Sequence, residues 1–175
     1  MLSKHRIMEI LSDIIIEEGG DLISQSNSDT GTIKSSDGVF DHIREIRSSS
    51  PIQNRVRIKA HIVIIFQIHG KKKLLICDYY EVPPSGPVGA LKIISQIRSP
   101  VEIFEADIAV VLLNTIPPQL TDQNGRIALK NVLSFGKNGQ ETLVLLVDEN
   151  NECIRNGLSY LDDLSSAISA ADNRP

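Results

Sequence analysis

Residues 69–92 read HGKKKLLICDYYEVPPSGPVGALK. This stretch begins with a basic turn and continues into a mainly apolar run, 74–82, that predicts a β-strand. The Pro and Gly residues at 83–87 end that strand, because proline lacks the backbone N–H that a central strand needs. Residues 88–98 then repeat apolar side chains at helical spacing. The stretch therefore predicts a turn, a strand, a corner and a helix, in that order.

The segments on either side of this stretch predict its partner strands. Residues 55–68, RVRIKAHIVIIFQI, begin with polar and apolar alternation and become almost wholly apolar, which is typical of a strand that starts at an exposed edge and enters a core. Because only a short turn separates 55–68 from 74–82, the two predict a β-hairpin. The apolar segment 106–115 follows the helix, so we expect it to be a buried strand in a parallel pair.

The remaining segments complete the predicted order. An amphipathic helix over 3–18 ends at Gly19-Gly20, and a short strand follows at 21–24. The other expected elements are loops at 25–38 and 47–54, a strand or helix at 39–46, helices at 120–133 and 158–171, and a strand at 141–149. This order predicts an α/β fold in three layers, with a mixed β-sheet flanked by helices. We expect a single domain over residues 1–171, with both loops flexible and 172–175 frayed.

The composition limits the function classes. Of 175 residues, 41% are hydrophobic and 23% are charged, as in a soluble globular protein. Aromatic residues make up 4%, which argues against a stacking platform for single-stranded nucleic acid.

The two cysteines, Cys77 and Cys153, lie in separate apolar segments and are expected to be buried free thiols. The acidic N-terminal helix is unlike a transit peptide, and no apolar run reaches the about 18 residues that span a bilayer. We expect an intracellular protein, cytoplasmic or nuclear, without a signal peptide or membrane association.

Basic residues are concentrated in one part of an acidic chain. The net charge is −4, yet residues 42–77 contain eight basic residues and one acidic residue, Glu45. A local excess of positive charge is typical of an anion-binding face. The alternative is that these cations protect a sheet edge from association. The candidate nucleic-acid-binding residues are Arg55, Arg57, Lys59, Lys71, Lys72 and Lys73.

Common catalytic motifs do not occur in the sequence. There is no Gly-rich phosphate loop, no GxSxG elbow and no HExxH zinc motif. The four histidines, at positions 5, 42, 61 and 69, are scattered along the chain. We therefore interpret each as a structural residue.

Three segments resemble a known family of nucleases. They are SDGVFDHI (36–43), GKKKLLICDYYEVPPSGPVGALK (70–92) and ADIAVVLLNTIPPQLT (106–121). With the order helix, Asp-containing loop, hairpin, crossover helix and buried strand, they resemble the Mrr-like branch of the restriction-endonuclease (PD-(D/E)XK) superfamily over about residues 1–135. The first resembles the segment that holds the first metal-binding Asp. The second resembles a strand ending in acid-x-Lys, followed by an aromatic residue and a Pro-Val-Gly turn, and the third resembles the next strand with its Thr-containing loop.

The resemblance implies a nuclease site that lacks the catalytic acid and lysine. In that family two carboxylates hold a divalent cation, which polarises the scissile phosphate, and a lysine stabilises the developing negative charge. Carried over, the first carboxylate is Asp41, or Asp37 if the loop aligns differently. The acid-x-Lys positions fall on Ile76, Cys77 and Asp78. Isoleucine cannot ligate a hard cation, and aspartate in place of lysine reverses the sign of the charge.

We therefore predict a restriction-endonuclease-like domain without catalytic or metal-binding residues and without a cofactor. It would act as a nucleic-acid-binding or complex-assembly subunit, with nucleic acid or a protein as its partner, and a homo- or hetero-oligomer is compatible with either role. One alternative is an active nuclease that holds Mg²⁺ through Asp41 and Asp78, with Lys92 on the following helix in place of the lost lysine. The other is a protein-interaction module of another α/β fold.

Overall fold

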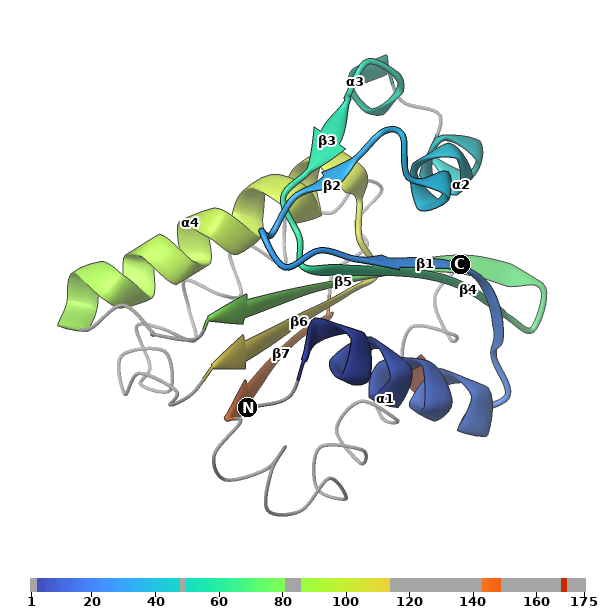
Figure 1. The fold of residues 1–175 in the computed structure, drawn as a ribbon, viewed down its shortest axis with the longest axis horizontal. Coiled ribbons are helices and arrows are strands. Elements are labelled where there is room, and N and C mark those ends of the chain that lie inside the picture. The colour runs from blue at the N-terminus through green and yellow to red at the C-terminus, as the bar shows by residue number, and fades with distance from the viewer. Residues whose placement is uncertain (1–2, 48–49, 81–85, 114–142, 149–167, 170–175) are drawn as a thin grey trace.

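The structure is a computed structural model that describes residues 3–47, 50–80, 86–113, 143–148 and 168–169 (Figure 1). Its helices are α1 (Lys4–Glu17), α2 (Gly38–Ile46), α3 (Ser50–Gln53) and α4 (Gly86–Phe104). Its strands are β1 (Asp21–Asn27), β2 (Ile33–Lys34), β3 (Arg57–Ile58), β4 (Ile62–Ile68), β5 (Lys71–Tyr80), β6 (Ile108–Leu113) and β7 (Leu143–Asp148). Five strands form one mixed sheet in the order β1-β4-β5-β6-β7, and β2 pairs separately with β3.

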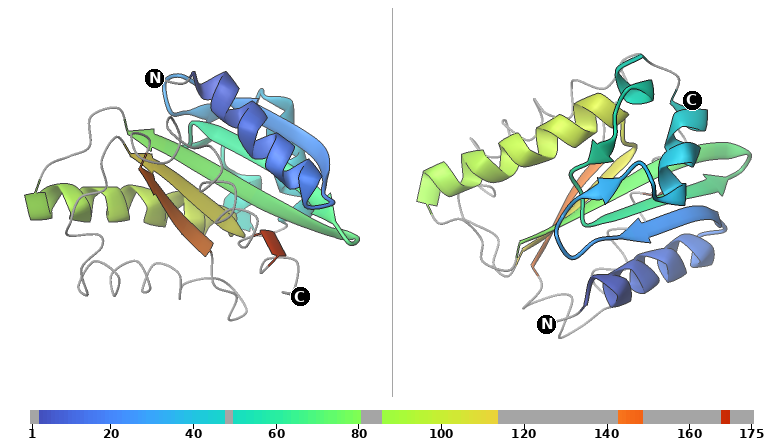
Figure 2. Two further views of the ribbon diagram at one scale, coloured as in Figure 1. Left: turned by 90° about the horizontal axis from the view of Figure 1, so that it is seen from below. Right: turned by 45° about the horizontal axis from the view of Figure 1, so that its top comes forward.

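The central strands β4, β5 and β6 are buried on both faces of the sheet. On one face, α1 packs its apolar stripe, including Leu11 and Ile15, against Ile64 and Phe66 of β4. On the other face, Phe40 of α2 and Phe104 of α4 belong to a second apolar cluster that includes the β2–β3 pair. Figure 2 shows α1 and α4 on opposite sides of the sheet. Helices on both faces explain why β4 is almost wholly apolar, since each of its faces packs on a layer. The predicted α/β fold with a mixed, helix-flanked sheet is confirmed.

The hairpin and the parallel crossover form as the sequence predicts. Strand β4 pairs antiparallel with β5, from Ile62 opposite Cys77 to Ile68 opposite Lys71. The two residues of the connecting turn, His69 and Gly70, have φ of 48° and 77°, and positive φ at both positions is what a type I′ turn requires. After α4, β6 pairs parallel with β5, and β7 pairs parallel with β6. Cys77 is a buried free thiol, as predicted, and Cys153 lies outside the described residues.

The strand predicted over 55–68 is interrupted. Residues Arg57–Ile58 leave the main sheet and pair with β2 as a separate ribbon, and β4 begins only at Ile62. The backbone of His61 marks the change, because its N–H donates to Cys77 O over 3.0 Å and its carbonyl accepts the Ser28 N–H over 2.8 Å. The basic half of the predicted strand is therefore separated from the buried half.

Several other boundaries also differ from the prediction. Strand β1 continues to Asn27, which pairs with Ile62, so part of the predicted 25–38 loop lies in the sheet. The segment 39–46 is helical, and a short helix, α3, forms within the predicted 47–54 loop. Helix α4 continues beyond residue 98 to Phe104, since Val101 and Phe104 extend its buried side. The predicted helix at 120–133, most of the one at 158–171 and the tail at 172–175 lie outside the described residues. No helix that the structure describes is both long and apolar enough to cross a membrane.

Gly20, which follows α1, tolerates no side chain. A Cβ atom at this position would lie 2.7 Å from Ile15 Cγ2 and 3.0 Å from the Ile15 carbonyl oxygen. Because Ile15 is fully buried, we expect Gly20→Ala to lower the free energy of unfolding by about 1–3 kcal/mol, measured by urea denaturation. Gly38→Ala is the matched control, since a Cβ there meets open space in the first turn of α2 and alanine favours the helix. Equal losses in the two variants would contradict the packing described here.

Candidate nucleic-acid interface

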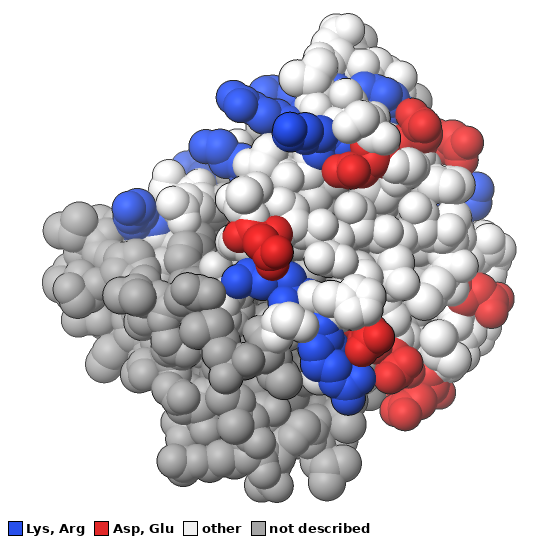
Figure 3. All heavy atoms as spheres, viewed as in Figure 1, with Lys and Arg blue, Asp and Glu red and all other residues white. Residues whose placement is uncertain are grey.

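Three of the predicted cations lie on β3 and the residues beside it. Arg55, Arg57 and Lys59 are exposed, whereas Ile58 is buried in the cluster that covers the sheet. Because successive residues of an extended chain point to opposite sides, Arg57 and Lys59 point away from the core on the side opposite Ile58. Figure 3 shows basic side chains gathered over the β2–β3 pair.

These cations form one wall of a groove against α4. The groove has a volume of about 440 Å³. Its second wall is polar and neutral, its floor is apolar, and none of its described lining residues is acidic. The lining residues are Arg55, Arg57 and Lys59 on the first wall, Ser95, Gln96 and Ser99 on the second, and Pro100, Ile103 and Phe104 on the floor.

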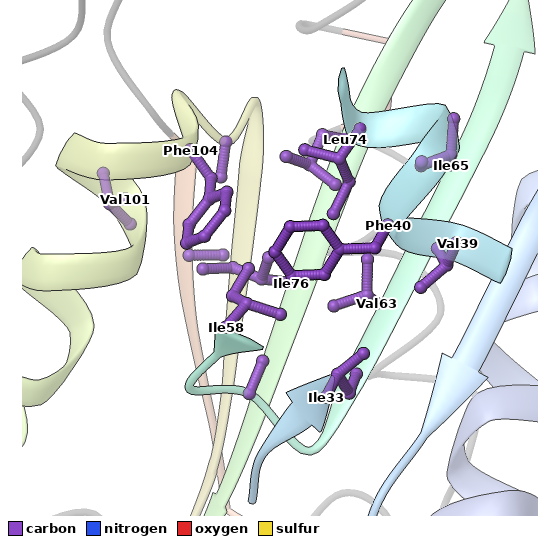
Figure 4. Close-up of a cluster of buried hydrophobic side chains, with 14 of the residues drawn as sticks. Ile33, Val39, Phe40, Ile58, Val63, Ile65, Leu74, Ile76, Val101 and Phe104 are labelled. Atoms are coloured by element: carbon purple, nitrogen blue, oxygen red, sulfur yellow. The ribbon is translucent and has the colours of Figure 1, made fainter. Parts of the chain in front are cut away.

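The floor of the groove is fixed by the core. The ring of Phe104 meets the ring of Phe40 edge to face, with 6.0 Å between centroids and 89° between planes. Figure 4 shows the Phe104 ring beside Val101 and the Phe40 ring beside Val63, with Ile58 below the two rings, so that β3, α2 and α4 meet at one cluster. Burial of these aromatic and branched side chains holds α4 in place relative to β3.

The backbone of the cationic wall is also held. Arg44 of α2 donates from Nη2 to the carbonyl oxygen of Arg55 over 2.9 Å, and its guanidinium lies 4.9 Å from the centroid of the Phe40 ring. The Ser35 N–H donates to the Val56 carbonyl oxygen over 2.7 Å, and Lys34 lies opposite Arg57 in the β2–β3 ribbon. The cations therefore project from a backbone that two neighbouring elements anchor.

The other predicted cations lie elsewhere. Lys71 and Lys72 begin β5, at the end of β4 that is remote from Lys59. Seven residues of β4 separate the two places, which corresponds to roughly 20 Å at the rise of an extended strand. Lys72 is exposed and Lys71 is half-buried. The six cations that the sequence suggested as one surface are therefore divided between two locations.

Lys73 is not a surface cation, so its prediction as a phosphate ligand is corrected. It is 3% exposed, and its Nζ lies 4.0 Å from Asp107 Oδ1. Asp107 Oδ2 also accepts from Arg47 Nη2 over 2.9 Å and from the Leu74 N–H over 2.7 Å. Arg47 in addition donates to the Glu105 carbonyl oxygen from Nε and Nη2. This cluster joins the end of α2 to β5 and to the turn before β6.

The Ile76 and Asp78 positions lie on the α4 side of β5. Ile76 is buried among apolar residues of that face. The carboxylate of Asp78, 15% exposed, has its Oδ1 3.4 Å from His61 Nδ1. The same Nδ1 accepts the Tyr79 N–H over 3.2 Å. In the neutral imidazole the proton is therefore on Nε2, because Nδ1 cannot both accept from Tyr79 and donate to Asp78.

The other residues of the alternative nuclease site do not share described contacts with Asp78. Asp41 on α2 is 75% exposed and lies 3.6 Å from Arg44 Nη1, and Lys92 is exposed on α4. Asp37 accepts the Lys34 N–H over 3.0 Å beside α2. Among the described contacts none joins Asp41 to Asp78, and no cluster of three or more His, Cys, Asp or Glu residues that could hold a metal occurs in the part of the chain that the structure describes.

Comparisons of the chain with protein-family models, with curated proteins and with solved structures found no match. Sequence reasoning identified the cationic wall but not Ser95, Gln96 and Ser99, which in the sequence are ordinary polar positions of an amphipathic helix. These three residues lie close to β3 because of the path that the chain takes at His61. The local sequence does not predict that path.

Proposed function

We propose that the chain is a non-catalytic nuclease-fold domain that binds nucleic acid through the groove between β3 and α4. The observation that carries this proposal is the wall of three exposed cations, Arg55, Arg57 and Lys59, in a groove whose described lining has no carboxylate. Each cation that neutralises a phosphate releases condensed counterions, and this release drives binding without reading sequence. The excess of negative charge elsewhere in the chain makes this local positive field the natural place for a polyanion.

The order of elements supports the nuclease-like part of the proposal. Helix α1, the β4–β5 hairpin, the crossover helix α4 and the parallel strand β6 follow one another as in the family that the sequence resembles. Ile76, which the resemblance aligns with a metal-binding acid, packs its side chain in the core. A buried isoleucine gives a divalent cation no oxygen ligand, which supports a binding role.

A complex-assembly subunit is the second candidate function. Val56 is 66% exposed between Arg55 and Arg57, so a protein partner that docks on β3 would remove this apolar side chain from water. In that case the cations beside it would orient a partner with an acidic surface. Binding that requires Val56 would favour the protein partner over nucleic acid, since phosphates contact the cations and not this apolar side chain.

A plasmid assay tests both the binding and the absence of chemistry. Incubated with supercoiled DNA and Mg²⁺ or Mn²⁺, the protein is expected to retard the plasmid at low salt and to leave it uncut. The reason is that the cationic groove is present, whereas Asp41 and Asp78 have different partners. Nicking that is lost in Asp78→Ala, but kept in Asp13→Ala on the exposed side of α1, would instead establish the active nuclease with Asp41, Asp78 and Lys92.

A further inference from the structure

The neutral wall of the groove is a row of hydrogen-bond donors. Ser95 and Ser99 are four residues apart on α4, which places them on the same side of the helix, and Gln96 adjoins them. All three side chains are exposed. Serine and glutamine frequently donate to phosphate oxygens and sugars in nucleic-acid complexes. A phosphate held by the cations of the first wall can therefore also accept hydrogen bonds from the second wall.

The spacing of the cations suits an extended backbone. Arg57 and Lys59 are alternate residues, so their Cα atoms lie about 6.6 Å apart if the chain between them is extended. This distance is comparable with that between successive phosphates of an extended nucleic-acid strand. One wall can thus contact consecutive phosphates of the same strand.

The floor of the groove offers apolar contact but no ring face. Ile103 is half-buried, and Pro100 and Phe104 are buried. The ring of Phe104 packs edge to face with Phe40 and is 2% exposed, so it cannot stack on a base. Recognition of single strands through their bases relies on exposed aromatic side chains. The floor is suited instead to the carbon atoms of a sugar.

We infer that the groove binds the sugar–phosphate backbone of one nucleic-acid strand and leaves its bases in solvent. The inference rests on the proposed function and adds the part of the ligand that is recognised. Phosphates lie between Arg57, Lys59 and the Ser95–Ser99 row, and a sugar contacts Ile103. The affinity for a strand should therefore not depend on the identity of its bases, or on whether its sugars carry bases at all.

Fluorescence anisotropy with two labelled strands of equal length tests this inference. An oligothymidylate and a strand in which most sugars lack a base are expected to bind within about twofold of each other, because both present the same phosphates and sugars. Tighter binding of the oligothymidylate by tenfold or more would overturn the inference, since the bases would then be contacted. If neither strand binds with an affinity that falls as salt rises, both this inference and the proposed function are wrong.

A double variant tests the donor row separately from the charge. Ser95→Ala with Ser99→Ala is expected to weaken binding about tenfold without changing its salt dependence, because neutral donors add hydrogen bonds but release no counterions. The variant should fold, since alanine favours a helix more than serine does. Ser36→Ala, at an exposed position outside the groove, is the control and should bind like the unmodified protein. Unchanged affinity of the double variant, with base-independent binding intact, would remove Ser95 and Ser99 from the site and overturn the two-walled arrangement.

Discussion

Asp107→Ala is expected to lower the free energy of unfolding by about 3–5 kcal/mol, the largest stability change of any single substitution proposed here. The carboxylate of Asp107 accepts hydrogen bonds from Arg47 and from the Leu74 N–H, and it faces Lys73. The side chains of Arg47 and Lys73 are 15% and 4% exposed, so neither cation can move readily into water. Removing the carboxylate takes away the acceptor for Arg47 and for the Leu74 N–H, and the anion that faces Lys73, which is costly at low dielectric. Urea denaturation measures the loss.

Two further variants separate the contributions at this cluster. Asp107→Asn keeps an oxygen that can accept the Leu74 N–H but removes the charge, so its loss should be smaller than that of Asp107→Ala. Glu102→Ala removes the carboxylate of an exposed pair with Arg98 on α4, and its effect should stay within about 0.5 kcal/mol. If Asp107→Ala were as mild as Glu102→Ala, the cluster would not hold α2, β5 and β6 together.

The combined variant Arg55→Ala, Arg57→Ala and Lys59→Ala is expected to weaken nucleic-acid binding about 100-fold or more at low salt. All three side chains are exposed and line the groove, so their removal abolishes the positive wall without opening the core. Anisotropy at one fixed low ionic strength measures the change, and circular dichroism checks that the fold is retained.

The hairpin end supplies the matched control for this variant. Lys71→Ala with Lys72→Ala also removes cations, but at the opposite end of β4. This pair should keep most of the affinity, because a ligand in the groove does not extend to it. Equal losses in the two combined variants would mean that binding follows overall charge and that the groove is not the site.

The main features of the fold could be predicted from the sequence. The β4–β5 hairpin follows from two apolar runs around a short turn, and the parallel β6 follows from an apolar run after a helix. The departure of β3 from the sheet could not be predicted, because alternation at 55–59 looks the same in the main sheet and in a separate ribbon. The sequence of 39–46 fits either a strand or a helix, since so short a segment spans only about two turns of a helix.

The candidate site was only partly predictable for a similar reason. Charge density identified Arg55, Arg57 and Lys59 correctly as exposed cations. Charge density also predicts Lys73 as a surface cation, which is wrong. The burial of its side chain depends on Asp107, which is distant in the sequence and looks like an ordinary acid beside a strand. The contact between His61 and Asp78 likewise depends on pairing between β4 and β5 and has no local signal.

The salt dependence of binding tests the central claim most directly. The affinity for one labelled strand is measured over a series of salt concentrations, for the unmodified protein and for the variant that lacks Arg55, Arg57 and Lys59. Because each phosphate neutralised on a single strand contributes about 0.7 to the slope of log affinity against log salt, the variant's slope should be less steep by about 2. Parallel lines for the two proteins would contradict the account, since the groove cations would then contact no phosphate.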